Sequence, residues 1–472
     1  MADIVQILTT NPLARQLGVP QPTDLRRGRE LPSGPVVLAT AGGPGSLVRQ
    51  TLDLLGINPL DALVDTPATR VTETDEEGRT REVPPSYPSR IGAIVLDATA
   101  LTTVEDLEQV RAVLRPALRS LEASGRVVVV GLEPDTAGAP TAVASQQALQ
   151  GITRTVGKEL RKGATANLVL VDLLTGTPTT AADLASTLSF LLEGRSAYVS
   201  GEILHVGHAG DAAAPAPARR PFEGQIVVVT GAGRGIGAAI AETFARDGAM
   251  VVAVDVAAGG EGLSKVANRI GGHALQLDIT APDAGSRIAG HVAQRFGEAA
   301  RIHTVVHNAG ITRDKLLVNT DEERWASVLE VNLAAQIRIN AVLLERSLPG
   351  GLDDGGRIVT VSSTTGLAGN AGQASYAASK AGLLGLVRAM GADPRLAERG
   401  ITVNAVAPGV IATEMWGKVP LVKRELGQRM NSLQQAGRPV DVAEAIAHLA
   451  DPATAAVTGQ VLRVEGQLMI GA

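Results

Sequence analysis

The feature that most constrains this chain is a glycine-rich turn between a short apolar run and an alanine-rich segment, within residues 226–248. The run 226–230 is β-branched, which is typical of a buried parallel strand, and the segment after the turn has helical spacing. Glycine lets such a turn bend sharply and approach a pyrophosphate, which the following helix N-terminus attracts. The stretch therefore predicts a dinucleotide site. Its four glycines are Gly231, Gly233, Gly235 and Gly237.

An acidic residue follows this turn at the distance that a dinucleotide site requires. The next strand-like run, 250–254, ends at Asp255, where a carboxylate can hydrogen-bond the adenosine ribose. Asp255 favours NAD(H), because its charge would repel the 2′-phosphate of NADP(H). Arg234 in the turn argues the other way, since a cation pairs with phosphate. We give Asp255 more weight, because its carboxylate would lie against the phosphate itself.

The composition excludes several other functional classes. The chain has 472 residues, enough for two or three domains, and it is 45% hydrophobic but only 2% aromatic. This favours an alanine-rich α/β protein, and the formal charge of −5 gives no basic footprint for nucleic acid or an anionic membrane. The absence of cysteine excludes disulfides and thiolate metal sites, and the seven histidines form no metal-binding spacing. We therefore expect no metal.

The N-terminus and the hydropathy indicate a compartment. The start, Met1-Ala-Asp-Ile-Val, lacks the basic residues and apolar core of a signal peptide. No run approaches the roughly 20 apolar residues of a membrane span. We therefore expect a soluble cytoplasmic protein.

Strand-like and helical segments alternate on both sides of an Ala/Pro-rich segment, 211–221, which indicates an extended linker. The alternation predicts a parallel, doubly wound sheet in each half, in domains 1–210 and 222–472. In the first half the expected strands lie at 35–41, 93–96, 126–130 and 167–171. The expected helices lie at 46–56 and at about 104–123, 145–161 and 180–193.

Candidate catalytic residues lie in the second half. Tyr376 and Lys380 are four apart in a helical run, so they share a helix face. A nearby ammonium lowers the pKa of a tyrosine, so Tyr376 is expected to exchange protons near neutrality. Ser362 and Ser363 end a strand-like run, where a hydroxyl can stabilise a developing oxyanion. Asn332, in an apolar helical stretch, must bond a neighbouring carbonyl or hold a water.

Together these motifs resemble the short-chain dehydrogenase/reductase family over residues 222–472. The family's glycine motif corresponds to Thr230–Gly237, and its Asn-Asn-Ala-Gly motif to His307–Gly310, with a histidine in the first position. Its Pro-Gly motif, which holds the nicotinamide carboxamide, corresponds to Pro408–Thr413. The resemblance implies a catalytic tetrad that contains Ser363 rather than Ser362, because of the spacing to the tyrosine. The implied tetrad is Asn332, Ser363, Tyr376 and Lys380.

The resemblance also implies a mechanism and a set of cofactor contacts. Ser363 would fix the substrate carbonyl, Tyr376 would protonate the alkoxide, Lys380 would hold the nicotinamide ribose, and Asn332 would support a water. The expected NAD(H)-binding residues are Gly231, Arg234, Gly235, Ile236, Gly237, Asp255, Asp278, Ile279, Asn308, Ala309, Gly310, Val331, Tyr376, Lys380, Pro408, Gly409, Ile411 and Thr413.

Within the family, the stretches 369–380, 400–415 and 458–467 look like those of 3-oxoacyl-(acyl carrier protein) reductases. The additional N-terminal domain resembles the long, high-molecular-weight form of that reductase found in actinobacteria, whose members are known as NADH-dependent reductases of 3-oxoacyl thioesters. The resemblance implies that activity, on acyl-CoA or acyl carrier protein thioesters in fatty-acid metabolism, and a homodimer. A steroid, polyol or quinone dehydrogenase remains an alternative, as does a non-catalytic scaffold protein.

One segment would decide among the substrates. Residues 414–436 are expected to cover the substrate, and four apolar side chains in this segment suit an acyl chain. They are Met415, Trp416, Val419 and Leu421.

The two halves also look like each other, which suggests an ancient duplication. Residues 145–157 match 379–391, and residues 198–207 match 456–465. In the first half, Ala142 and Gln146 align with the candidate tyrosine and lysine, and the turn 40–47 has lost two glycines. We therefore expect a flavodoxin-like or degenerate nucleotide-binding domain without chemistry, which serves dimer contact or partner docking.

Overall fold

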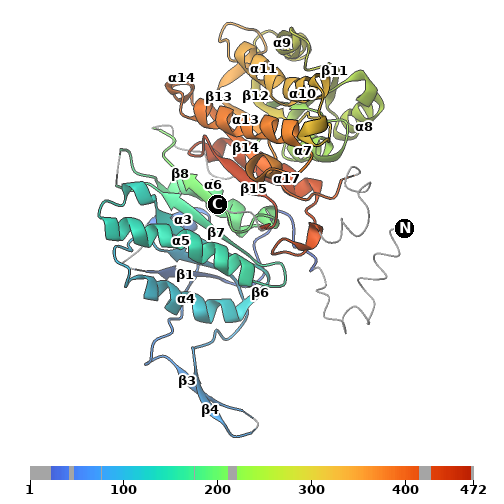
Figure 1. Cartoon of the computed structure of the whole chain (residues 1–472). Coiled ribbons are helices and arrows are strands. Elements are labelled where there is room, and N and C mark those ends of the chain that lie inside the picture. Colours follow the sequence, from blue (N-terminus) through green and yellow to red (C-terminus); the bar gives the residue numbers. More distant parts are fainter. Residues whose placement is uncertain are drawn as a thin grey trace.

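The computed structural model describes residues 23–41, 47–75, 77–174, 176–210, 220–413 and 427–468. Within these residues the chain forms two parallel sheets, one in each half, which Figure 1 shows as two lobes. The predicted α/β class is therefore confirmed. Several predictions lie outside the described residues: those for the turn residues 42–46, for most of the linker, and for residues 414–426 with Met415, Trp416, Val419 and Leu421.

The N-terminal sheet has six parallel strands in the order β2-β1-β5-β6-β7-β8. Without the hairpin described below, this is the flavodoxin-like order 2-1-3-4-5 with one strand added, as the sequence predicted. Helices α3 and α6 cover one face of the sheet, and α4 and α5 cover the other. The strands are β1 (Val36–Thr40), β2 (Leu60–Asp61), β5 (Ile91–Asp97), β6 (Leu121–Leu132), β7 (Thr165–Val171) and β8 (Ile203–Val206), and the helices are α3 (Leu47–Leu54), α4 (Leu107–Ser120), α5 (Pro140–Glu159) and α6 (Ala181–Leu192).

The C-terminal sheet has seven parallel strands in the order β11-β10-β9-β12-β13-β14-β15, which is the Rossmann order 3-2-1-4-5-6 with a seventh strand. Helices α7, α8 and α17 cover one face, and α9, α11 and α13 cover the other. The strands are β9 (Ile226–Thr230), β10 (Met250–Asp255), β11 (His273–Gln276), β12 (Ile302–His307), β13 (Leu352–Val361), β14 (Thr402–Pro408) and β15 (Val461–Val464). The helices are α7 (Gly235–Arg246), α8 (Gly260–Ile270), α9 (Ala284–Phe296), α10 (Glu322–Leu329), α11 (Ala335–Leu343), α12 (Thr364–Ala368), α13 (Ala374–Gly391), α14 (Pro394–Ala397) and α17 (Pro439–Ala450).

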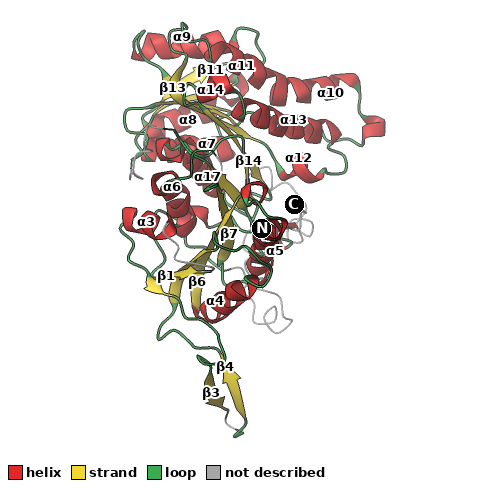
Figure 2. Cartoon of the chain, turned by 90° about the vertical axis from the view of Figure 1, so that its left-hand side faces the viewer, coloured by secondary structure: helices red, strands yellow, loops and turns green. Residues whose placement is uncertain are grey.

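An antiparallel hairpin that the sequence did not predict lies outside both sheets. Its strands are β3 (Val71–Thr74) and β4 (Thr80–Val83), and almost all of its residues are exposed. Figure 2 shows it projecting from the end of the N-terminal lobe that is remote from the C-terminal sheet. Among the described residues, no helix is both long and apolar enough to cross a membrane.

The two sheets share one hydrophobic cluster. Side chains from α3, α6 and the N-terminal sheet belong to the same buried cluster as those from α7, α17 and the C-terminal sheet. At its centre the rings of Phe190 (α6) and His448 (α17) stack with centroids 4.3 Å apart, and both residues are fully buried. This shared core joins the halves more tightly than a linker would.

The junction has an approximate two-fold symmetry. The matched segments 198–207 and 456–465 are offset by 258 residues; at this offset their side-chain contacts are reciprocal, and their backbone contacts are reciprocal to within one residue. Gly207 N donates to Ala456 O at 2.9 Å, and Gly466 N donates to Tyr198 O at 3.0 Å. A further pair crosses the junction in each direction: Glu202 with Arg463 and Gln460 with His205. Such an arrangement is that of a symmetric dimer interface within one chain, and it supports the inferred duplication.

The shared core predicts that the halves unfold together. Phe190→Ala should lower the free energy of unfolding by about 3–5 kcal/mol, because it leaves a cavity at a fully buried position. Calorimetry of this variant should show a single transition at a lower Tm. Phe296→Ala is the control, because this half-buried ring packs on His273 within the C-terminal half. Its removal should lower the free energy of unfolding by less. Two separate transitions in the unaltered protein would contradict a shared core.

Candidate active site

The candidate residues meet at one edge of the C-terminal sheet. All seven strands are parallel, so their carboxyl ends lie at the same edge. There β9 leads into the glycine turn, β10 ends at Asp255, β12 precedes Asn308, β13 precedes Ser362, and β14 ends at Pro408. The strand order therefore brings together motifs that are up to 180 residues apart.

The glycine turn leaves the start of α7 open to a ligand. Gly231 has a φ of +66°, and a Cβ on Gly237 would lie 2.0 Å from Gly231 O, so only glycine fits the close approach of turn and helix. No side chain of the described residues caps α7, which leaves its first N–H groups available to an anion. Ile236 lies in this first turn, and exposed Arg234 precedes it. The turn fits a pyrophosphate.

Asp255 is held in place by backbone groups. Gly233 N donates to Oδ2 at 2.9 Å and Val256 N donates to Oδ1 at 2.8 Å. Each carboxylate oxygen keeps a lone pair that can accept from a ribose hydroxyl. Further along this edge, Asp278 is exposed and hydrogen-bonded to Thr280, whereas Ile279 is buried.

The segment after β12 contacts both the glycine turn and the catalytic residues. Asn308 Nδ2 donates to Thr230 O at 3.1 Å and to Gly231 O at 3.0 Å, so this amide holds the turn. A Cβ on Gly310 would lie 3.2 Å from Asn332 Oδ1 and 3.5 Å from Lys380 Nζ. Because Gly310 has no side chain, the space in front of the lysine stays open.

Asn332 and Val331 lie in a π-helical turn, Glu330–Ala334, between α10 and α11. Such turns are rare and frequently mark functional sites. Asn332 is fully buried; its Oδ1 accepts from Ile311 N at 2.8 Å, and its Nδ2 donates to Ile311 O and to Ser379 Oγ, each at 3.0 Å. Of the two roles that the sequence left open, the structure thus shows the bond to a neighbouring carbonyl.

The two adjacent serines have different surroundings. Ser362 is buried and donates to the backbone carbonyl of Lys380 at 2.8 Å. Ser363 caps α12, where its Oγ accepts from Thr365 N at 3.2 Å, and its hydroxyl lies close enough to that of Tyr376 to lower the pKa of the tyrosine. The geometry therefore favours Ser363 as the hydroxyl that faces a substrate, in agreement with the motif spacing.

Lys380 is buried on the same helix as Tyr376. Its Nζ donates to Val361 O at 2.7 Å and lies 5.6 Å from the centroid of the Tyr376 ring. Burial lowers the pKa of Lys380 to about 8. The ammonium thus sits beside the tyrosine and is bonded to the strand that precedes Ser363.

The pKa of Tyr376 differs from the sequence-based expectation. We expected Lys380 to lower it, but burial raises it, and the hydrogen bond with Ser363 offsets only part of that effect. Asp314, which the sequence reasoning did not single out, raises it further. The reason is that Lys380 lies over the ring rather than beside the hydroxyl.

The Pro-Gly stretch continues from β14 and faces the glycine turn. Gly409 N donates to Val464 O at 3.0 Å, which ties the stretch to the end of β15. Ile411 is buried. If Gly235 carried a Cβ, that atom would lie 3.9 Å from Thr413 Cγ2. Pro408–Thr413 therefore borders the space above the helix N-terminus.

Sequence reasoning missed one buried residue that organises the tetrad. Ser379 Oγ accepts from Asn332 and donates to Tyr376 O at 2.8 Å, so it links two of the candidate catalytic residues. Its position directly before Lys380 and one helical turn after Tyr376 is the signal that could have identified it.

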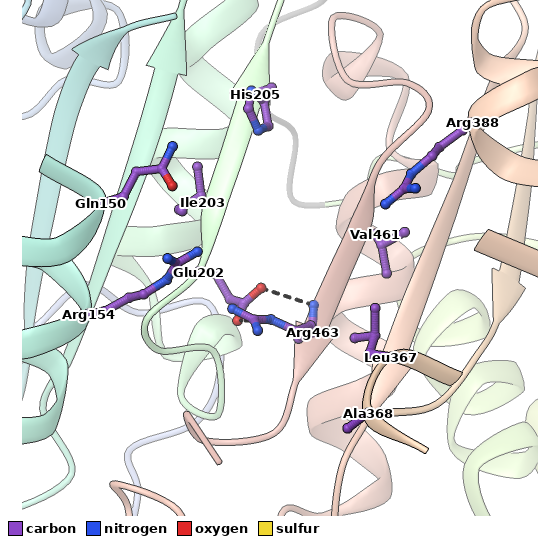
Figure 3. A pocket seen from close by; sticks show the side chains of 10 residues that line it. All are labelled: Gln150, Arg154, Glu202, Ile203, His205, Leu367, Ala368, Arg388, Val461 and Arg463. Carbon is purple, nitrogen blue, oxygen red and sulfur yellow. Dashed lines mark hydrogen bonds and ion pairs between the residues drawn. The ribbon is translucent and has the colours of Figure 1, made fainter. Parts of the chain in front are cut away.

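A cavity of about 500 Å³ lies between the two halves, close to this site. Figure 3 shows Gln150 and Arg154 on one side, Arg388 on the other, and the Glu202–Arg463 ion pair between them. None of the described residues that line it belongs to the tetrad, although Arg388 is on the same helix as Tyr376. Burial raises the pKa of Glu202 to about 7, so this pair is only partly charged near neutrality.

Comparisons with known proteins match the C-terminal half. A family model described as enoyl-(acyl carrier protein) reductase matches residues 231–466. The chain is 38% identical over 247 residues to a 3-oxoacyl-[acyl-carrier-protein] reductase of Vibrio cholerae, and 40% identical over 254 residues to that of Escherichia coli. Each match covers 52% of this chain and 97% of the relative. The one from Thermotoga maritima is 39% identical over 252 residues.

The buried ammonium predicts a pH-dependent stability. The unfolded chain keeps the Lys380 proton up to about pH 10.5, whereas the folded chain releases it near 8. Stability should therefore rise with pH across this window, by at most about 1.4 kcal/mol per pH unit from this group. In urea unfolding between pH 8 and 10, the free energy of unfolding should rise less with pH in Lys380→Met than in the unaltered protein. Equal slopes in the two proteins would contradict a buried, protonated lysine at pH 7.

Proposed function

The chain belongs to the short-chain dehydrogenase/reductase family, and from this membership we propose that it reduces 3-oxoacyl thioesters to 3-hydroxyacyl thioesters with NADH. The acyl group would be carried by coenzyme A or acyl carrier protein, in fatty-acid metabolism. One observation supports this reaction above the others: the hydroxyl of Ser363 lies close enough to that of Tyr376 to lower the pKa of the tyrosine, and the buried ammonium of Lys380 lies over the Tyr376 ring. Two neighbouring hydroxyl donors suit the developing oxyanion of a ketone.

NADH, when bound, supplies the hydride. Ser363 then donates a hydrogen bond to the substrate carbonyl oxygen and fixes its orientation. Tyr376 donates its proton to that oxygen as the alkoxide develops; its raised pKa keeps it protonated, hence ready to donate, at neutral pH. Lys380, whose buried ammonium lies over the Tyr376 ring, would hold the nicotinamide ribose.

The remaining residues support this arrangement. Asn332 fixes the backbone at Ile311 and, through Ser379, the start of the catalytic helix. The water that we assigned to Asn332 would bind at the remaining lone pair of Oδ1, because both Nδ2 protons have protein partners.

The N-terminal half, we propose, carries no chemistry of its own. Gln146, which aligns with Lys380, is buried; its Oε1 accepts from Leu132 N at 2.8 Å and its Nε2 donates to Ala98 O and Leu101 O, each at 3.0 Å. A fully bonded amide thus occupies the place of the ammonium. The N-terminal half also covers the β15 edge of the C-terminal sheet, which supports a homodimer through the remaining surface rather than a tetramer.

The reaction is tested by NADH oxidation in the presence of acetoacetyl-CoA and longer 3-oxoacyl thioesters. Turnover should exceed that with a 2-enoyl thioester, a steroid, a polyol or a quinone. A preference for the 2-enoyl thioester would instead favour the activity named by the family model. Absence of turnover with every substrate would favour a non-catalytic scaffold protein.

This test uses one tyrosine variant and a matched pair of serine variants. Tyr376→Phe should abolish turnover but leave NADH binding largely intact. Ser363→Ala should lower kcat by about 10²–10³-fold, as the loss of an oxyanion donor does. Ser362→Ala removes the neighbouring hydroxyl and should cost stability rather than turnover. Equal activities of the two serine variants would contradict the assignment of Ser363.

Cofactor preference should follow the charge at residue 255. We expect kcat/KM with NADH to exceed that with NADPH at least tenfold, because the Asp255 carboxylate would face the 2′-phosphate. Asp255→Ala should lower this ratio, because it weakens the binding of NADH and removes the repulsion of NADPH. The control Arg234→Ala should raise the ratio, because it removes a cation that can pair with the 2′-phosphate of NADPH. Equal kcat/KM values for the two cofactors in the unaltered protein would contradict the preference.

A further inference from the structure

Tyr198 belongs to the N-terminal half, yet its side chain packs into the C-terminal half. No part of it is exposed. Its ring fits between two glycines: a Cβ on Gly437 would lie 2.5 Å from ring atom Cε1, and a Cβ on Gly466 would lie 2.9 Å from Cε2. Any larger residue at either position would have to displace the ring or the backbone. Two C-terminal glycines thus form a slot for one N-terminal ring.

The hydroxyl at the end of this ring is hydrogen-bonded to the C-terminal backbone. It donates to Gln435 O at 2.8 Å and lies 3.4 Å from Val410 O, while Asn431 Nδ2 donates to it at 2.9 Å. Burial raises the pKa of Tyr198, so the hydroxyl stays protonated and able to donate at physiological pH. Because the hydroxyl is buried, water would not replace its hydrogen bonds if the hydroxyl were removed.

The slot adjoins the stretch Pro408–Thr413. Gly437 N donates to Val410 O at 3.0 Å, and Gly437 O accepts from Ala412 N at 2.8 Å. A Cβ on Gly437 would also lie 2.8 Å from Ile411 Cδ1, so the glycine is confined between the Tyr198 ring and this side chain. The ring, Gly437 and the stretch therefore form one packed unit.

We propose that Tyr198 is a positioning residue through which the N-terminal half holds Pro408–Thr413 in the conformation that receives the nicotinamide. This inference rests on the proposed function, because it takes that stretch to bind NADH. If the stretch visits other conformations, the apparent affinity for NADH falls by the fraction of chains in the competent one. The matched position in the C-terminal half is Ala456, so this contact is made in one direction across the junction.

The test is Tyr198→Phe in the full-length chain, which removes the hydroxyl but keeps the ring. The Kd and KM for NADH should rise about three- to tenfold, which is what loss of one buried hydrogen bond predicts. At saturating NADH, kcat should change less than about twofold, because the tetrad lies on other elements. Gly437→Ala, which crowds the ring, should shift KM in the same direction.

The matched control is Tyr87→Phe. This tyrosine is also in the N-terminal half, and its hydroxyl accepts a hydrogen bond from Leu63 N at 2.9 Å. Both residues are remote in sequence from the junction segment 198–207. It is the only other tyrosine besides Tyr376. NADH binding should be unchanged in this variant.

Each outcome decides the inference. An unchanged Kd and KM in Tyr198→Phe would overturn it, as would a lower Tm without a shift in KM, because the ring would then serve stability alone. An equal rise in KM in Tyr87→Phe would also overturn it. Failure of the unaltered protein to bind NADH would refute the proposed function and this inference with it, whereas normal binding with an unaffected Tyr198→Phe refutes the inference alone.

Discussion

The constraint on which the site depends is that a parallel strand must be buried on both faces. Successive strands of the C-terminal sheet are therefore joined by crossovers, and every carboxyl end lies at one edge. This brings Asp255, Asn308, Ser363 and Pro408 together although they are far apart in the sequence. The chemistry then requires only small adjustments at that edge: glycines where the backbone must come close, and a buried lysine where a charge must be held.

The buried ammonium of Lys380 explains much of the remaining geometry. Burial disfavours its charge, and the carbonyl of Val361 offsets part of that cost. The same helix presents Tyr376 to Ser363, and Ser379 ties that helix to the π-helical turn of Asn332. A change in any one of these groups would be transmitted to the others through hydrogen bonds that have no water to replace them.

The junction between the halves shows what the N-terminal half contributes to the structure. It buries the inner faces of both sheets in one cluster, and its contacts are reciprocal, as at a dimer interface. At the position that aligns with Lys380, Gln146 makes three buried hydrogen bonds. Through Tyr198, the N-terminal half contacts the backbone of the C-terminal half at Val410 and Gln435. We regard the N-terminal half as a built-in partner of the C-terminal one.

The sequence by itself determined the two α/β halves, because periodicity and β-branched runs depend on local chain chemistry. It also indicated the glycine turn and the tetrad, because each requires a particular residue type at a particular spacing. Only the tertiary structure decided the pKa of Tyr376, the partners of Asn332, the hairpin outside the sheets and the slot of Tyr198. These depend on distances between groups that are far apart in the chain, such as Tyr198 and Gly437. Burial and long-range contact, which set pKa values and fix backbone segments, leave no local pattern in a sequence.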